Sequence, residues 1–217
     1  MPPSKITTQK FLRAAQSGDL HTNNESALQW SAIKGHLDLV KYLLIHGADV
    51  HTGDNNALRH SARNGHLPVV QYLVQNGADV QALDNCALQW SAANGHPAVV
   101  QYLLDNGANV HARNDGALRQ SSENGLLSVV QILLHQGANV HARNDVALLW
   151  SAENGHLPMV QILIEYGADV LVGIEAAQDQ PKILSWLEDY QRMQYEQVLL
   201  SEVESTLVAI TPKFQRL

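Results

Sequence analysis

The chain has 217 residues, of which 45% are hydrophobic and 16% charged, values typical of a soluble globular protein that buries a core. Its formal net charge of −7 disfavours DNA or RNA as the main partner, because a phosphate backbone attracts a basic surface. The single cysteine, Cys86, excludes an internal disulfide, and the sequence has neither a membrane-spanning stretch nor a secretory leader, so we expect a cytoplasmic protein.

The N-terminal segment, residues 1–26, is predicted to form a capping helix. Its stretch FLRAAQSGDL supplies one helix, which aligns equally well with either helix of the repeated unit that follows. A repeat array needs modified ends that shield the apolar face of its terminal units from water. We therefore expect this segment to cover the first unit.

Residues 27–170 contain five copies of a 30-residue unit. An Ala-Leu pair marks the unit and recurs at positions 27, 57, 87, 117 and 147. A first glycine follows at 35, 65, 95, 125 and 155, and a second at 47, 77, 107, 137 and 167. Self-similarity at a constant period is the signature of an architecture in which each unit stacks on its neighbours.

Each unit is predicted to form two short helices. From Ala57, apolar or small residues recur at helical spacing until Gly65, a residue that tolerates the left-handed conformation at a helix end. The second helix has proline in its first turn in three units and ends at the second glycine. Pairs such as Asp54-Asn55 precede the first helix and are expected to cap it. Helices of about 8 to 10 residues are unstable alone in water, so they must stack.

The unit ALRHSARNGHLPVVQYLVQNGADV, residues 57–80, resembles the ankyrin repeat. The resemblance implies an all-α solenoid that binds proteins through the concave face formed by its first helices. The usual repeat has about 33 residues, so the shorter unit predicts shortened finger loops, and the family's Thr-Pro opening is absent. This short form is similar to arrays from giant viruses of amoebae and some intracellular bacteria, which would imply a location in the host cytoplasm.

Residues 171–217 are predicted to form a degenerate capping repeat and a C-terminal amphipathic helix. The stretch ILSWLEDY at 183–190 aligns with the second helix MVQILIEY at 159–166, but only 24 residues further on. Apolar residues continue at helical spacing beyond it, in one long helix or two pieces. Two interpretations remain open: a lid over the last repeat, or a docking helix for a partner.

The histidines do not indicate a metal site. His36, His66, His96 and His156 follow the first glycine of four units, so neighbouring copies lie about 8 to 10 Å apart, whereas zinc holds its nitrogens at about 2.0 to 2.1 Å. We expect these side chains to stabilise their turns by hydrogen bonds. The fourth unit has Leu126 at this position and Ser122 where the others have alanine, which predicts a weak point in the stack.

The sequence predicts neither a catalytic residue nor a cofactor site. Small serines recur at the same position of the first helix in all five units, which indicates packing rather than nucleophilic catalysis. Cys86 occupies a variable position, and the Gly-Ala pairs end helices rather than cradle phosphate. We therefore expect a protein that is not an enzyme.

Positions that vary between units on the first helix are the candidates for recognition. Tryptophan stands at one of them in three units, where the indole can pack between helices or project into the groove as an anchor. At Trp90 we expect both, a partly buried ring with an edge that a partner can reach. Arginines form a central basic strip with glutamates beyond it, which suits a partner segment of acidic and apolar character. The predicted partner-binding residues are Trp30, Arg59, His60, Arg63, Gln89, Trp90, Arg119, Glu123, Trp150 and Glu153.

These patterns together predict a monomeric protein-interaction module that binds a partner protein, without metal, nucleic acid or membrane. The alternative is an adaptor, in which the repeats select a target and the C-terminal helix recruits a second protein.

Overall fold

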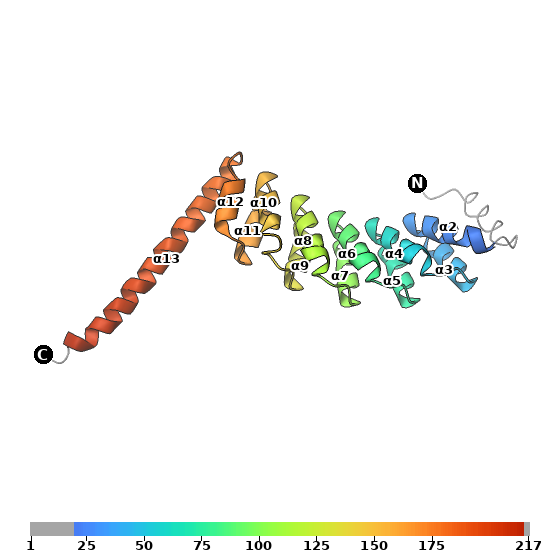
Figure 1. The fold of residues 1–217 in the computed structure, drawn as a ribbon, viewed down its shortest axis with the longest axis horizontal. Helices are drawn as coiled ribbons and strands as arrows, with labels where there is room; N and C mark the ends of the chain where they lie inside the picture. The colour runs from blue at the N-terminus through green and yellow to red at the C-terminus, as the bar shows by residue number, and fades with distance from the viewer. Residues whose placement is uncertain (1–19, 215–217) are drawn as a thin grey trace.

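The computed structural model describes the backbone of residues 20–214, and it consists of two rows of stacked helices followed by one long helix (Figure 1). The first row contains α2 (Leu20–Ile33), α4 (Thr52–Arg63), α6 (Ala82–Ala93), α8 (Ala112–Glu123), α10 (Val146–Glu153) and α12 (Val170–Ala176). The second row contains α3 (Leu37–Ile45), α5 (Leu67–Gln75), α7 (Pro97–Asp105), α9 (Leu127–His135) and α11 (Leu157–Glu165), and α13 (Pro181–Phe214) ends the chain. The described residues include no strand, and the predicted all-α solenoid is confirmed.

We expect an N-terminal cap at residues 1–26, and residues 1–19 of this segment lie outside the described part of the chain. From Leu20 the backbone is helical and runs without a break into the first unit as α2.

The core runs between the two rows of helices. Each unit contributes one leucine from each helix, such as Leu58 and Leu73, both of which are fully buried. The recurrent serine beside them is also buried, and in the second unit the Ser61 hydroxyl donates to the carbonyl of Leu58 at 3.0 Å. Because this hydroxyl is satisfied within its own helix, the small side chain allows α4 to pack against both α2 and α6.

A turn of three left-handed residues replaces the longer finger at the start of the first helices. In α4 these residues are Gly53, Asp54 and Asn55, with φ of 59°, 55° and 60°. The same turn lies within α6 and α8 and directly before α10, where Leu83, Arg113 and Arg143 occupy the position of Gly53. Asparagine and aspartate tolerate this conformation better than leucine or arginine do.

The prediction that Asp and Asn cap their own helix is wrong. No side chain caps the N-terminus of α4, α6, α8 or α10. The side chain of Asn55 instead accepts a hydrogen bond of 2.8 Å from the backbone N–H of Asp79, in the loop that leads to the next unit. Asn85, Asp115 and Asp145 accept the equivalent bonds from residues 109, 139 and 169. These polar residues therefore join neighbouring units.

The histidines after the first glycine also join units rather than stabilise their own turns. The Nε2 atom of His66 donates to the carbonyl of Ile33 at 2.9 Å, and His96 and His156 bond to residues 63 and 123 in the same way. The imidazole of His66 lies so close to Gly35, which has a φ of 72°, that an added Cβ would stand 2.6 Å from Nδ1. Glycine is needed there both for the turn and for this contact.

The long helix α13 packs on the end of the stack only through its first turns. Ile183 and Leu187 are buried against the end of the stack, and α13 contacts α11 and α12. Beyond Gln191 all side chains described, through residue 206, are exposed. Figure 1 shows this part projecting away from the repeats as one continuous helix. We call residues 192–206 the arm.

Candidate interaction surface

The structure places nine of the ten predicted binding residues where solvent reaches them. Arg63, Glu123 and Glu153 are exposed. Six others are half-buried along the first row: Trp30, Arg59, His60, Trp90, Arg119 and Trp150.

Gln89 is not part of this surface. Its side chain is 4% exposed, which leaves too little area for contact with a partner. Its amide donates to the carbonyl of Asp84 at 3.0 Å, within the left-handed turn of its own unit. Arg59 and Arg119 clamp the equivalent turns through Nε and Nη2. This structural role did not follow from the sequence, because it depends on the conformation of the turn.

Trp90 lies at the centre of a cluster formed by two neighbouring units. The guanidinium carbons of Arg59 and Arg63 lie 5.5 and 5.6 Å from its ring centroid, within the range of cation–π attraction. The ring of His60 lies 5.3 Å from the indole, tilted by 60°. All three partners come from α4, so the stacking of α6 on α4 assembles the cluster. We call these four residues the Trp90 cluster.

The Trp90 cluster carries the positive charges of two arginines. Among the described residues, no carboxylate forms an ion pair with Arg59 or Arg63. Arg59 is held by the carbonyls of its turn, whereas the guanidinium of Arg63 lies over the Trp90 ring and forms no hydrogen bond or ion pair within the described part of the chain. Burial, and then the charges of Arg59 and Arg63, lower the pKa of His60 from its ordinary value.

The other two tryptophans have different surroundings. Trp150 lies 6.0 Å from the guanidinium of Arg119, a weaker version of the Trp90 arrangement. Burial, together with the charge of Arg143, lowers the pKa of Arg119, while Asp115 opposes the change. Trp30 lies 5.2 Å from the ring of His36 and packs against the buried core, which Trp90 and Trp150 do not. The packing interpretation therefore fits Trp30, and the exposed-edge interpretation fits Trp90.

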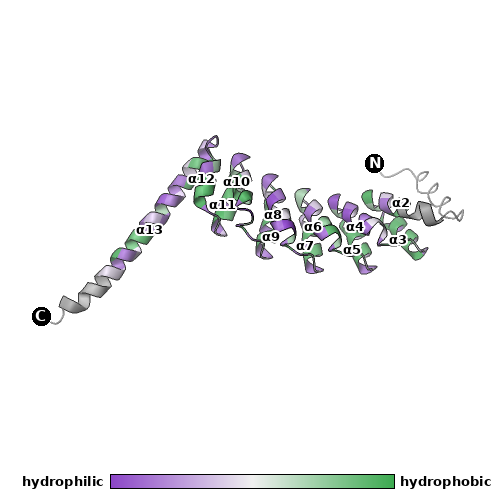
Figure 2. Ribbon diagram, in the orientation of Figure 1, coloured by the Kyte–Doolittle hydropathy of each residue, from purple (hydrophilic) through white to green (hydrophobic). Residues whose placement is uncertain are grey.

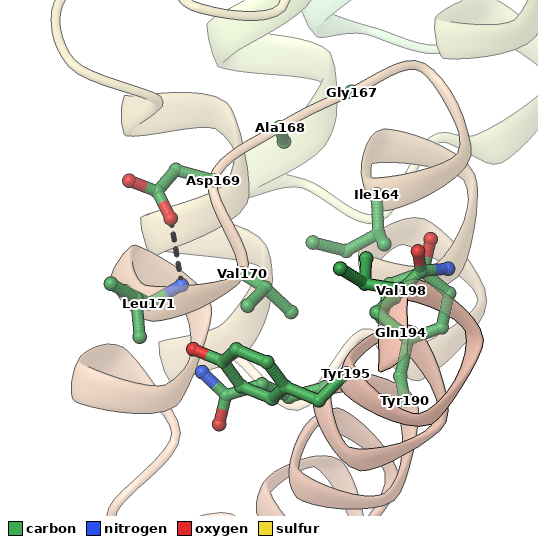
Figure 3. Close-up of a pocket in the computed structure, with 11 residues that line it drawn as sticks. Ile164, Gly167, Ala168, Asp169, Val170, Leu171, Tyr190, Gln194, Tyr195 and Val198 are labelled. Atoms are coloured by element: carbon green, nitrogen blue, oxygen red, sulfur yellow. Dashed lines mark hydrogen bonds between the residues drawn. The ribbon is translucent and has the colours of Figure 1, made fainter. Parts of the chain in front are cut away.

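A pocket between α13 and the end of the stack is the main feature that the sequence did not reveal. It has a volume of about 420 Å³ and is open to solvent. Figure 3 shows Val170 and Leu171 of α12 on one side and Tyr195 and Val198 of the arm on the other. The apolar spacing beyond Tyr190 is visible in the sequence, but whether those residues pack or project is not. We call this pocket the terminal pocket.

The described part of the chain offers neither a cluster of metal ligands nor a membrane-spanning helix. Its His, Cys, Asp and Glu side chains form no group of three that could hold a metal ion. None of its helices is long and apolar enough to cross a membrane.

Comparison with protein families gives a specific match to most of the chain. A family model described as ankyrin repeats in three copies matches residues 6–84, 53–114 and 82–144. A second model, described as the ankyrin repeat, matches residues 146–173. A search of curated proteins finds no significant match.

Proposed function

Because the chain belongs to the ankyrin-repeat family, we propose that it binds a segment of another protein along the exposed side of its first helices, without catalysing a reaction. Repeats of this family are generally protein–protein interaction modules. The proposed surface is the half-buried and exposed side of α2, α4, α6, α8 and α10, with the Trp90 cluster at its centre.

The observation that carries this proposal is the unpaired charge around Trp90. Two arginines lie near one half-buried indole, and no carboxylate of the described chain pairs with either of them. The chain as a whole has a net charge of −7, so a local excess of cations is not a property of its composition. Such a site attracts a carboxylate, while the edge of the indole offers apolar area, the combination that often dominates binding energy.

The partner segment is therefore expected to be acidic and apolar. Arg63 is the cation best placed to contact it, because Arg59 already donates to two backbone carbonyls. Those bonds hold Arg59 in place before a partner arrives, which reduces the entropy lost on binding. Glu123 and Glu153 lie further along the row and disfavour a segment that is acidic throughout its length.

Capture of the partner from the native or host cell, followed by mass spectrometry, tests the proposal. The wild-type chain should retain a protein that Trp90→Ala and Arg63→Glu variants lose. Tyr102→Ala is the matched control, since Tyr102 is also a half-buried aromatic but belongs to the second row. A partner that binds all four proteins equally would contradict the proposed surface.

A second candidate function is that of an adaptor with two binding sites. The observation that favours it is the arm, whose large apolar side chains Met193, Tyr195, Val198, Leu199, Leu200 and Val203 are all exposed. A chain that ends at Gln191 should keep the partner of the repeats and lose a second partner. Loss of both partners, or of neither, would contradict the adaptor.

A further inference from the structure

The arm carries an apolar band that leads into the terminal pocket. Tyr195, Val198, Leu199 and Val203 follow the spacing i, i+3, i+4 and i+8, which places them on one side of a helix. Tyr195 and Val198 also line the terminal pocket, together with Ile164, Val170 and Leu171 from the last unit. Figure 2 shows hydrophobic segments along the projecting part of α13. The band and the pocket therefore form one continuous apolar surface.

The charges on the arm indicate what this surface attracts. The arm contains Glu196, Glu202 and Glu204 and a single cation, Arg192, which lies at its start and pairs with Asp189 at 3.4 Å. Glu202 lies within the band, four residues from Val198 and three from Leu199, so it faces whatever covers these side chains. A second copy of the arm would bring glutamates toward glutamates, which is unfavourable. A basic partner would be attracted.

We propose that the arm and the terminal pocket bind a basic amphipathic helix of a partner protein. This inference rests on the second candidate function and specifies the chemistry of the protein that the arm recruits. Apolar side chains of the partner helix pack on the band and enter the terminal pocket, and its lysines or arginines pair with Glu196 and Glu202. This is the helix-against-helix mode of recognition, read through side chains three and four residues apart.

The shape of the surface favours a helix over a small ligand. The terminal pocket is open along one side, whereas small-molecule sites enclose most of the ligand. A second hollow, of about 340 Å³, lies further along the arm between Leu199, Glu202, Val203 and Thr206. Two hollows along one helix match the successive side chains of a partner helix better than they match one compact molecule.

The test uses the full-length chain and two synthetic helical peptides that share one leucine stripe. One peptide carries lysines beside the stripe and the other carries glutamates, and binding is measured by fluorescence anisotropy. The lysine peptide should bind the wild-type chain at the arm. The Trp90 cluster attracts acidic segments, so any binding of the glutamate peptide should be unaffected by Val198→Asp. Val198→Asp should weaken binding of the lysine peptide by about tenfold or more. Met193→Asp is the matched control, because Met193 and Val198 are both 53% exposed but Met193 lies outside the band.

Charge reversal provides the second part of the experiment. Glu202→Lys should weaken binding of the lysine peptide and create binding of the glutamate peptide. The Trp90 cluster is tested separately, by capture of the native partner with Arg63→Glu, so a failure of the lysine peptide to bind the arm is distinguishable from a failure of the proposed function. The proposal is overturned if the lysine peptide does not bind the wild-type chain. It is also overturned if both peptides bind with affinities that Glu202→Lys does not change, or if Val198→Asp and Met193→Asp weaken binding equally. Dimerisation of the wild-type chain that Val198→Asp abolishes would assign the surface to a second copy instead, and would overturn it as well.

Discussion

The side-chain amide of Asn124 donates a hydrogen bond of 3.0 Å to the carbonyl oxygen of Ala93. At the junctions on either side, a histidine donates to the equivalent carbonyl. Asparagines at the same position as Asn124 bond within their own helix, as Asn94 does to Trp90. Asn124 therefore compensates for the histidine that the fourth unit lacks. At the last junction, the side-chain amide of Gln180 donates to the equivalent carbonyl, that of Glu153, at 3.0 Å.

The first prediction concerns Ser122, the other unusual residue of the fourth unit. Its hydroxyl is buried without a hydrogen-bond partner, and such a group costs about 1 to 3 kcal/mol. Ser122→Ala should therefore raise the free energy of unfolding by about 1 kcal/mol, measured by urea denaturation. Ser121→Ala is the control and should not stabilise, because the Ser121 hydroxyl donates to carbonyls within its helix. Leu126→His should be close to neutral, since the carbonyl of Ala93 is already bonded. A large gain from Leu126→His would contradict the compensating role of Asn124.

The second prediction concerns the left-handed turn at Leu83. A residue with a Cβ pays about 1 to 2 kcal/mol in this conformation, and Leu83 has a φ of 50°. Leu83→Gly should raise the melting temperature, because Leu83 is 47% exposed and the strain relieved outweighs the partly buried area that is lost. The reverse change at the equivalent position, Gly53→Leu, should lower it. Thermal unfolding of both variants checks the pair, and shifts of the same sign would refute the assignment of strain.

The third prediction compares two tryptophans. Trp30 packs against the buried core and Trp90 does not, so Trp30→Ala should cost roughly 3 kcal/mol of stability. Trp90→Ala should cost only about 1 to 2 kcal/mol, for the lost cation–π contacts and the partly buried area. Urea midpoints measured under identical conditions decide between them. Equal losses would show that the indole of Trp90 is also mainly a packing element.

The fourth prediction concerns acid. The pKa of His60 is lowered in the fold, by burial and then by Arg59 and Arg63, so the unfolded chain binds a proton more readily. Stability from neutral His60 is fully present above the ordinary pKa of about 6.5 and is lost as the pH falls through it toward the folded pKa. His60→Gln, which introduces the residue found at Gln120 in the fourth unit, removes this contribution. The urea midpoint of wild type should fall more than that of the variant between about pH 8 and about pH 5. Parallel changes would exclude His60 as the cause.

The fifth prediction separates the cap from the arm. Ile183 and Leu187 are buried on the last unit, whereas the arm contributes little to the core. A chain that ends at Gln191 should melt within a few degrees of the full chain, and one that ends at Gln180 should melt well below it. Circular dichroism of the two truncations measures this difference. A strong destabilisation by removal of the arm alone would assign it a role in the fold.

The sequence predicts the fold well because the repeat period is a local and repeated signal. Residues within one unit are enough to predict the two helices, the prolines in the first turn of the second helix and the buried leucines. The bonds between units do not, because Asn55 and Asp79 lie 24 residues apart and look like independent capping residues. The same reason explains Gln89, whose variable position suggested recognition but whose amide clamps a turn that local propensity would not predict. The position of Trp90 was predictable, but the arginines beside its ring required the stacking geometry.

The junction bonds also determine how such an array can change in length. The histidines at 66, 96 and 156 bond to carbonyls 33 residues earlier, and the asparagines or aspartates at 55, 85, 115 and 145 bond to N–H groups 24 residues later. A tandem duplication of residues 57–86 would place every donor of the inserted copy opposite the same acceptor in its neighbour. Evolution can therefore add or delete whole units in this part of the gene without leaving a broken bond, so the reach of the binding surface is free to vary while the ends stay the same.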